Sequence, residues 1–306
     1  AAPPPPPDHS TDMVDAATMS ASFLSAQLAK KREHRPFDFD MYYRHIEAHT
    51  WRSTIIPFSK ELAEACVRYY KSRYNIGPQS PSLTSSRDAQ LLRTLEAQID
   101  REIKAASAQR QSGQCFIRMS NRSPKDGCPL DTSKFRRDAR AELVKLNAEL
   151  DLSQLELLNL AGEAEAIVAN DVMVAYSGAQ LKSLCVQSGR EAMCLLLSSE
   201  RVYTDLLLAL SCAVDPDDEW ATFLILREWD ETLQHDREFR CFVSNGVMTA
   251  ISQYNHYCWF SDLSAKVAED GNGVGMRREI VDYWQRVRDG IPMESYVFGL
   301  VPPLAL

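Results

Sequence analysis

A β-hairpin is predicted at Glu238-Phe239-Arg240-Cys241-Phe242-Val243, the pair Asn245-Gly246, and the stretch from Val247 to Ser252. Asn-Gly is a strong turn signal, because the type I′ turn between two antiparallel strands needs a positive φ at both central residues. Strand alternation gives one apolar face, Phe239, Cys241 and Val243, and a second face, Glu238, Arg240 and Phe242. An arginine beside a glutamate on a strand face fits a structural ion pair as well as a ligand contact.

Two further strands are predicted upstream of the hairpin. Phe223-Leu224-Ile225-Leu226 is an apolar run of strand length that ends in the polar groups of Arg227-Glu228-Trp229. The alternating segment Cys115 to Met119 places Arg118 on its more polar face, and the charged loop Ser120 to Gly127 follows it. A final extended segment, Tyr296 to Val301, precedes two prolines.

Helical periodicity accounts for most of the remaining chain. Ser59 is a predicted N-cap for a helix that carries Leu62, and a longer helix has its apolar stripe from Leu91 to Ile103. The pattern is mostly helical from Ser133 to about Leu210, and another helix runs from Arg277 to Arg288. The order of helices, strand, helices and several strands predicts an α+β fold rather than regular βαβ alternation.

Composition limits the classes of function. The 306 residues contain 34 Lys and Arg against 42 Asp and Glu, which gives 34 − 42 = −8, so a global basic surface for duplex DNA is excluded. The longest apolar runs, such as Leu206 to Leu210, are far shorter than the roughly 20 residues of a membrane span, and a soluble, cytoplasmic protein is expected. The 8 cysteines form no C-x-x-C pair, so reduced and mostly buried thiols are expected.

Common catalytic and nucleotide motifs are missing from the sequence. It contains no G-x-x-x-x-G-K-[ST] loop and no G-x-S-x-G elbow, and the cluster Gly271 to Gly275 does not follow a strand. His45 and His49 stand four residues apart without a third metal ligand. The remaining chemistry is that of Arg118, Lys125, Asp126, Arg227 and Arg240, whose cationic members could converge on phosphates.

The hairpin resembles the signature of the cell division cycle protein 123 family, whose members have an ATP-grasp fold. The resemblance rests on Glu238 to Val243 followed by Ile251-Ser252-Gln253, and on Phe223 to Trp229, which is similar to the strand that supplies the family's adenine-side hinge. Phe116 to Asp126, with its Ser-Pro-Lys-Asp ending, looks like the family's phosphate-side strand and loop. Trp51 to Tyr70 resembles the family's N-terminal strand and helix.

The resemblance implies an ATP-grasp-like fold with two lobes, mostly antiparallel sheets and flanking helices. The expected organisation is a disordered Pro-rich tail over 1–35, an N-terminal α+β lobe with a helical insertion over 36–215, and a β-rich C-terminal lobe, incomplete at its end, over 216–306. The implied cofactors are ATP and Mg²⁺. The implied ATP-binding residues are Arg118, Lys125, Asp126, Leu226, Arg227, Trp229 and Arg240.

The resemblance also implies a function, which is assembly of eukaryotic translation initiation factor 2 through its γ subunit. Two departures from the family's sequence pattern bear on this expected function. Arg118 stands where the family usually has a lysine, and a guanidinium does not lose its proton to become a nucleophile. Gly299 stands where the family has a metal-binding aspartate. The alternatives are an ATP-grasp ligase acting on RNA or a carboxylate substrate, and a nucleotide-free pseudoenzyme scaffold.

Overall fold

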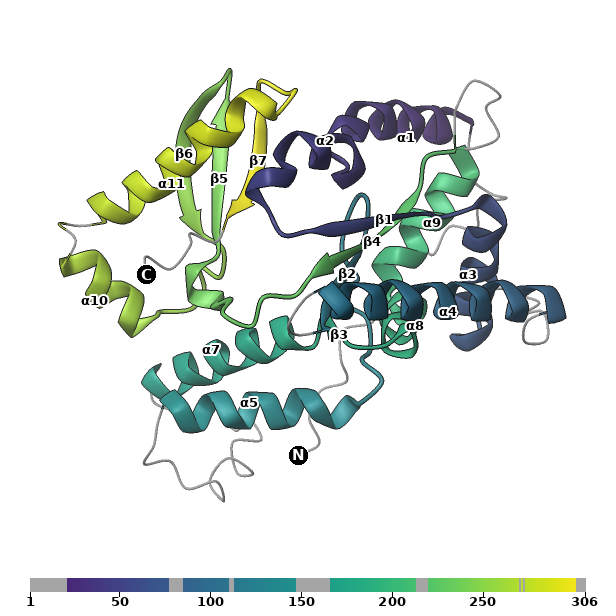
Figure 1. Ribbon diagram of the computed structural model, residues 1–306, viewed down its shortest axis with the longest axis horizontal. Coiled ribbons are helices and arrows are strands. Elements are labelled where there is room, and N and C mark those ends of the chain that lie inside the picture. The colour runs from purple at the N-terminus through teal and green to yellow at the C-terminus, as the bar shows by residue number, and fades with distance from the viewer. Residues whose placement is uncertain are drawn as a thin grey trace.

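Two antiparallel sheets organise the chain in the computed structural model (Figure 1). The structure describes residues 21–76, 85–109, 113–146, 166–212, 220–269, 271 and 273–300. A four-stranded sheet has the order β1-β4-β2-β3, and a three-stranded sheet has the order β6-β5-β7. The strands are β1 (Ser53–Pro57), β2 (Cys115–Met119), β3 (Cys185–Val186), β4 (Phe223–Glu228), β5 (Phe239–Ser244), β6 (Val247–Gln253) and β7 (Tyr296–Leu300).

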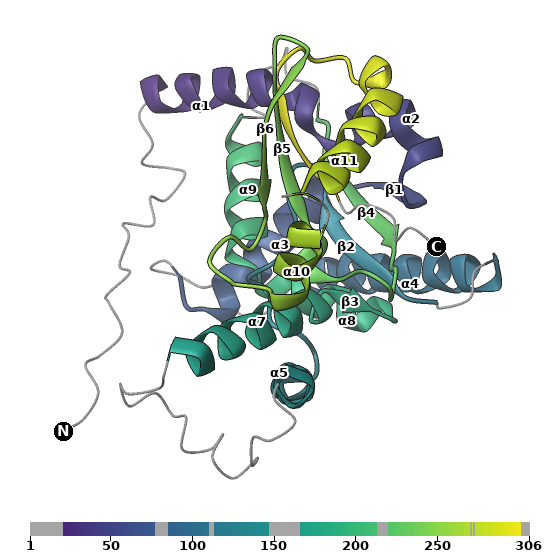
Figure 2. The same cartoon turned by 90° about the vertical axis from the view of Figure 1, so that its left-hand side faces the viewer.

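Helices α1 and α2 lie at the opposite end of the molecule from α5 and α7 (Figures 1 and 2). The α-helices are α1 (Ala21–His34), α2 (Phe39–Ile46), α3 (Lys60–Arg73), α4 (Ser86–Gln109), α5 (Thr132–Leu146), α7 (Ala166–Lys182), α8 (Gly189–Ser198), α9 (Glu200–Cys212), α10 (Ser261–Glu269) and α11 (Val274–Val287). Short 3₁₀ turns occupy Arg35–Phe37, Glu47–His49, His235–Arg237 and Arg288–Gly290. Within the described ranges, no helix is both long enough and apolar enough to cross a membrane.

The main core lies on one face of the four-stranded sheet. Cys115, Ile117 and Met119 point into it from β2, as their alternation predicts, and pack against residues of α3, α4, α8 and α9. Ser59 accepts a hydrogen bond from the backbone N–H of Leu62 and caps α3, which confirms the predicted start of that helix. The other face of the sheet carries Ile225 and is covered by α2.

The predicted hairpin is confirmed as β5 and β6. Asn245 and Gly246 have φ values of 49° and 69°, as a type I′ turn requires. One face of this sheet packs on α11 through Phe239, Cys241 and Ile280. On the other face Phe242 and Val297 remain exposed, so the sheet has one buried and one accessible side.

The structure differs from the sequence-based expectations at three places. Regular structure begins before Pro36, because α1 occupies Ala21–His34 within the predicted tail, while residues 1–20 lie outside the described residues. The short strand β3 interrupts the stretch expected to be helical. Although β4 follows the predicted boundary at 215, it is hydrogen-bonded between β1 and β2, so the chain passes to the second sheet only after Glu228.

Candidate functional site

A cavity of about 880 Å³ lies between the two sheets, and we call it the inter-sheet cavity. One wall carries Trp51, Arg118 and Arg227 from the α2 side of the four-stranded sheet. The opposite wall carries Tyr283 of α11 and Gly299 of β7. A volume of this size is typical of pockets for cofactors and other small molecules.

Arg227 carries a charge into this cavity without a carboxylate partner among the described residues. It donates to the Thr50 hydroxyl, and its Cζ lies 4.9 Å from the centre of the Trp51 ring and 5.7 Å from that of Phe39. Within the described ranges, its buried Nε has no hydrogen-bond partner. Burial lowers the pKa of the Arg227 guanidinium, and the nearby charge of Arg118 lowers it further. An anion in the cavity would relieve both effects.

Arg118 is held at the end of β2 by backbone carbonyls. Its Nε donates to Met119 O at 3.0 Å, and its Nη2 donates to Ser120 O at 3.3 Å and Asn121 O at 3.2 Å. Its Cζ lies 5.3 Å from the centre of the Phe39 ring, which Arg227 also approaches. The structure therefore brings these two predicted residues together around one aromatic side chain.

Arg237 also lines the inter-sheet cavity, although sequence reasoning did not select it. The residue is only 6% exposed, and its Nε and Nη1 atoms have no hydrogen-bond partner among the residues that the structure describes. It borders a second, smaller cavity that Glu269 and Glu279 also line, but neither carboxylate accepts a hydrogen bond from those two nitrogens. Nothing in the polar run His235-Asp236-Arg237 indicated burial, because a 3₁₀ turn has no long hydrophobic period to read.

Lys125 and Arg240 are far apart in the sequence but form a separate group around Tyr254. Lys125 Nζ donates to Tyr254 Oη at 2.7 Å, and the Arg240 Cζ lies 4.4 Å from the centre of the same ring. Burial raises the pKa of Tyr254, but the hydrogen bond and charge of Lys125 outweigh it, and the net pKa is lowered. Burial also raises the pKa of Glu238, while the charges of Lys125 and Arg240 oppose this rise. In the described part of the chain, Lys125 and Arg240 are not among the residues lining the inter-sheet cavity.

The other three predicted site residues have structural contacts. The Asp126 carboxylate accepts from Ser199 Oγ at 2.6 Å and from the backbone N–H of Arg201 at 3.0 Å, at the start of α9. The Leu226 side chain is buried in the main core. Trp229 is buried, and its backbone N–H donates to Gln114 O at 3.1 Å. Their roles in ATP binding stay predictions.

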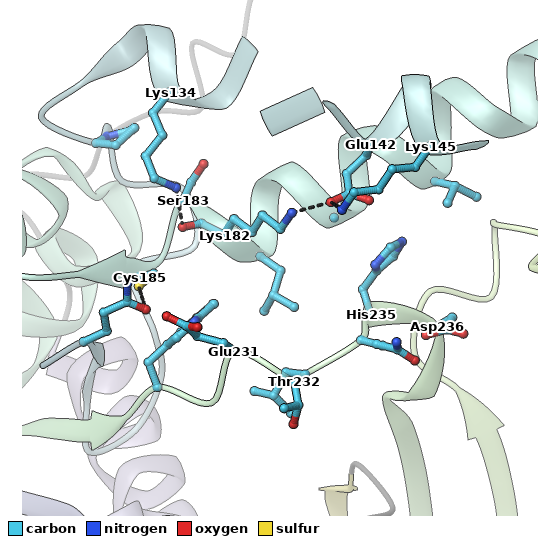
Figure 3. A pocket seen from close by; sticks show the side chains of 18 of the residues that line it. Lys134, Glu142, Lys145, Lys182, Ser183, Cys185, Glu231, Thr232, His235 and Asp236 are labelled. Atoms are coloured by element: carbon cyan, nitrogen blue, oxygen red, sulfur yellow. Dashed lines mark hydrogen bonds and ion pairs between the residues drawn. The ribbon is translucent and has the colours of Figure 1, made fainter. Parts of the chain in front are cut away.

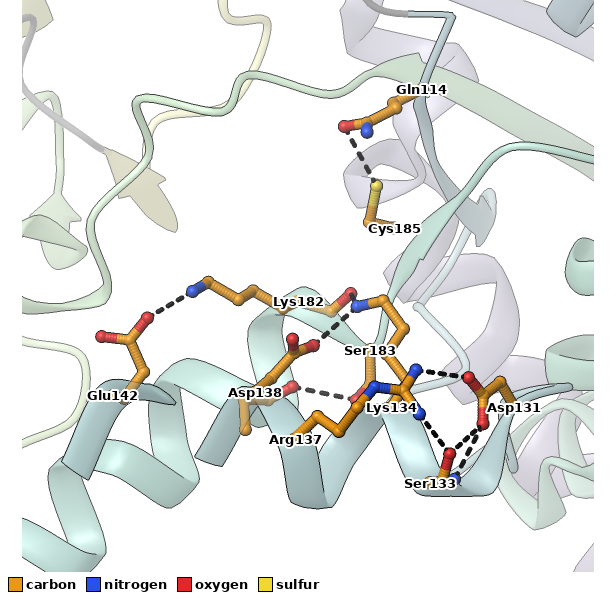
Figure 4. Close-up of polar contacts among 11 residues, drawn as sticks. Gln114, Asp131, Ser133, Lys134, Arg137, Asp138, Glu142, Lys182, Ser183 and Cys185 are labelled. Carbon is orange, nitrogen blue, oxygen red and sulfur yellow. Dashed lines mark hydrogen bonds and ion pairs between the residues drawn. The ribbon is translucent and has the colours of Figure 1, made fainter. Parts of the chain in front are cut away.

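A larger cavity of about 1000 Å³ is lined by residues of α5 and α7 and of the segment that follows β4 (Figure 3). Its lysines are paired within the protein: Lys182 with Glu142, and Lys134 with Asp138 at 2.7 Å and with Lys182 O at 3.1 Å (Figure 4). His235 has a buried Nε2 without a hydrogen-bond partner in the described part of the chain. Burial lowers the pKa of this imidazole. Because these lysines already have acceptors, this cavity offers an anion fewer cationic hydrogen-bond donors than the inter-sheet cavity does.

Carboxylates are scarce in the inter-sheet cavity. Its lining contains Glu228 and Asp230, and Asp230 already accepts hydrogen bonds from Trp51 Nε1 at 3.1 Å and from Thr232 N at 2.8 Å. Among the residues that the structure describes, no group of three His, Cys, Asp or Glu could hold a metal ion. The donor set therefore suits an anion better than it suits a protein-held Mg²⁺.

Together these features define an α+β protein with an arginine-lined cavity between two antiparallel sheets. The family model of D123 matches residues 178–303, which include β4 to β7. This match confirms the resemblance predicted from the sequence over residues 178–303.

Solved structures of Cdc123 from Schizosaccharomyces pombe are similar to this chain. The C-terminally truncated form is 17% identical with a TM-score of 0.50, over 89% of this chain and 80% of that chain. Another structure is 16% identical with a TM-score of 0.47, over 86% of this chain and 77% of that chain. The former supports the α+β fold. A search of curated proteins gave no match.

Proposed function

We propose that this protein binds ATP in the inter-sheet cavity and acts in the cytoplasm as an assembly factor for eukaryotic translation initiation factor 2, through its γ subunit. The observation that carries the proposal is the group of arginines, Arg118, Arg227 and Arg237, that line a cavity of about 880 Å³. Guanidinium groups bind phosphate oxygens in pairs, and the Trp51 ring beside Arg227 supplies an apolar surface for a base. The match to D123 supports the γ subunit of the initiation factor, which is the partner implied by the family resemblance, as the partner of this chain.

The first test is ATP binding, measured as the rise in melting temperature over an ATP titration with and without magnesium. A ligand that binds only the folded protein stabilises it by about 2.7 kcal/mol at one hundred times its Kd, which a melting curve resolves. We expect Arg227→Ala to abolish most of the rise. The exposed Arg93, which donates to Gln90 on α4, provides the matched control Arg93→Ala and should leave the rise unchanged. Absence of any rise at millimolar ATP would remove the nucleotide part of the proposal.

The second test is capture of the initiation factor γ subunit on the immobilised full chain. Enrichment over an unrelated bait supports the assembly function, and its absence removes that function even if ATP binds. ATP-dependent release of phosphate or pyrophosphate over a panel of RNA ends would instead favour the ligase alternative. Capture of the γ subunit by a protein that shows no ATP shift would favour the nucleotide-free scaffold.

A further inference from the structure

The larger cavity, of about 1000 Å³, has an excess of negative charge, and we call it the acidic cavity. Seven carboxylates and three lysines line it, which gives 3 − 7 = −4. Burial lowers the pKa of His235, so its imidazole adds no positive charge at neutral pH. A cleft lined mainly by charges of one sign concentrates their field and attracts ligands of the opposite sign.

The three lysines of the acidic cavity already have carboxylate partners. Lys182 and Lys145 both form ion pairs with Glu142, and Lys134 forms one with Asp138. Figure 3 shows Glu231 on the segment after β4, on the opposite side of the cavity from Glu142. The acids of this cavity that form no ion pair with a described residue include Glu191, Glu231, Asp236 and Asp262. Their charges are therefore available to a ligand.

Exposed apolar side chains line the same cavity. Trp259 is 63% exposed, Leu130 50% and Leu146 41%. The Oδ1 of Asn170 on α7 accepts from the Trp259 backbone N–H at 2.7 Å, and its Nδ2 donates to Trp259 O at 2.9 Å. These two bonds hold the backbone while the indole stays accessible. Exposed apolar groups gathered at a cleft are typical of an interaction surface, and tryptophan is the best aromatic partner for a cation.

From this combination we propose that the acidic cavity is the docking site for a basic segment of a protein partner, in which lysine or arginine is interspersed with apolar side chains. The cationic groups pair with acids such as Glu231 and Asp236, and the apolar groups contact Trp259 and Leu130. A peptide segment fits better than a small cation, because the available acids are spread over α8, the segment after β4 and the start of α10. The proposal does not depend on ATP in the inter-sheet cavity.

The test is fluorescence polarisation of three fluorescein-labelled peptides with the full chain at about 0.15 M salt. The sequences, in one-letter code, are KKLKKLKK, KKGKKGKK and EELEELEE. We expect the first to bind at least about tenfold more tightly than the second, because its leucines bury apolar surface, and the third not to bind. Equal affinities of the first two, or no binding of KKLKKLKK, would overturn the proposal and leave the proposed function standing.

The acids of the cavity are tested against the general negative charge of the chain. The double variant Glu231→Gln with Asp236→Asn should weaken binding of KKLKKLKK by about fivefold or more, since it removes two of the proposed ion pairs. The matched control is Asp289→Asn with Glu294→Gln, which changes the net charge equally at exposed residues that do not line the acidic cavity. Equal weakening by the two double variants would show non-specific attraction and contradict the proposed site.

Trp259 tests the apolar part of the docking surface. Trp259→Ser should weaken binding of KKLKKLKK by about fivefold, whereas Trp259→Phe, which keeps an aromatic face, should retain most of the affinity. Because the indole is exposed, both variants should keep the melting temperature of the wild type. Leu130→Ser, at a second exposed position, tests the same surface independently. Full affinity in both serine variants would contradict the apolar contacts.

Competition with spermine separates a peptide ligand from a small polycation. Spermine carries several positive charges but has no apolar side chains to contact Trp259 and Leu130. It should therefore displace labelled KKLKKLKK only at concentrations at least about tenfold higher than the unlabelled peptide requires. Displacement at equal concentrations would overturn the peptide proposal in favour of a small polycation.

Discussion

Arg227 and Arg237 are charged residues that the fold buries at a cost in folding energy. Taking a guanidinium out of water is unfavourable unless hydrogen bonds and charges replace the water. For Arg227 the fold supplies one hydroxyl and two aromatic rings. For Arg237 neither Nε nor Nη1 has a partner. The burial of these two guanidinium groups is therefore only partly compensated by contacts within the described residues.

We expect the stability of the protein to depend on pH through His235, which lies two residues before Arg237. Its folded pKa lies below the ordinary value because the imidazole is buried, so the unfolded chain binds the proton more readily than the folded chain. The stability that the neutral His235 imidazole contributes is fully present above its unfolded pKa of about 6.5 and is lost as pH falls below that value. The free energy of unfolding, measured with urea, should fall between pH 7.5 and pH 5.5 by about 1 kcal/mol more in the wild type than in His235→Asn.

Asparagine is the appropriate replacement because it retains a short polar side chain beside Val174 while removing the titrating group. The shift of His235 includes a hydrogen bond with the Val174 backbone, which the amide can replace in part. Equal losses of stability in the two proteins between pH 7.5 and 5.5 would contradict the assignment. Measuring at constant ionic strength keeps surface charge effects the same in both.

At the scale of elements, the β5–β6 turn depends on backbone conformation alone. Gly246 has a φ of 69° and no atom within 4 Å of a Cβ placed on it, so a side chain there would be strained but not crowded. Gly246→Ala should therefore lower the free energy of unfolding by about 1 kcal/mol. Gly299→Ala is the control, since that position is equally open but is not left-handed. A denaturant midpoint that falls equally in both variants would contradict this reason.

Elements with strong local signals were predictable from the sequence. The Asn245-Gly246 turn, the Ser59 cap and the alternation of Cys115 to Met119 each depend on a few adjacent residues, and the structure confirms all three. The strand β3 has only two residues, Cys185–Val186, and its partner β2 is distant in the sequence. A segment this short has no hydrophobic periodicity from which a strand could be predicted. The helix α1 was missed because its residues were grouped with the proline run that precedes them.

The candidate site was predictable only in part, for a related reason. Arg118 and Arg227 lie on strands whose alternation shows which face they share, and β2 and β4 are hydrogen-bonded neighbours. Lys125 lies in a loop and Arg240 in the other sheet, and the folded chain places them beside Tyr254 rather than beside Arg227. Sequence patterns specify the face of a strand but not the distance between loops and sheets.

At the scale of the whole molecule, the inter-sheet cavity joins segments that are far apart in the chain. Arg227 donates to Thr50, and Tyr283 donates to His49 O, so β4 and α11 both reach the segment before β1. Gly299 on β7 closes the opposite wall. A ligand that contacts both walls would link the two sheets, since its binding energy is lost whenever either wall opens.

We therefore expect ATP to slow hydrogen exchange on both walls at once. Backbone amides in 48–52 and in 296–300 should gain protection together at saturating ATP, because local opening of either segment must first release the ligand. The exchange of 86–109 in α4, whose residues do not line the cavity in the described chain, should not change and serves as the internal reference. Protection confined to 48–52 would mean that the ligand contacts only the four-stranded sheet.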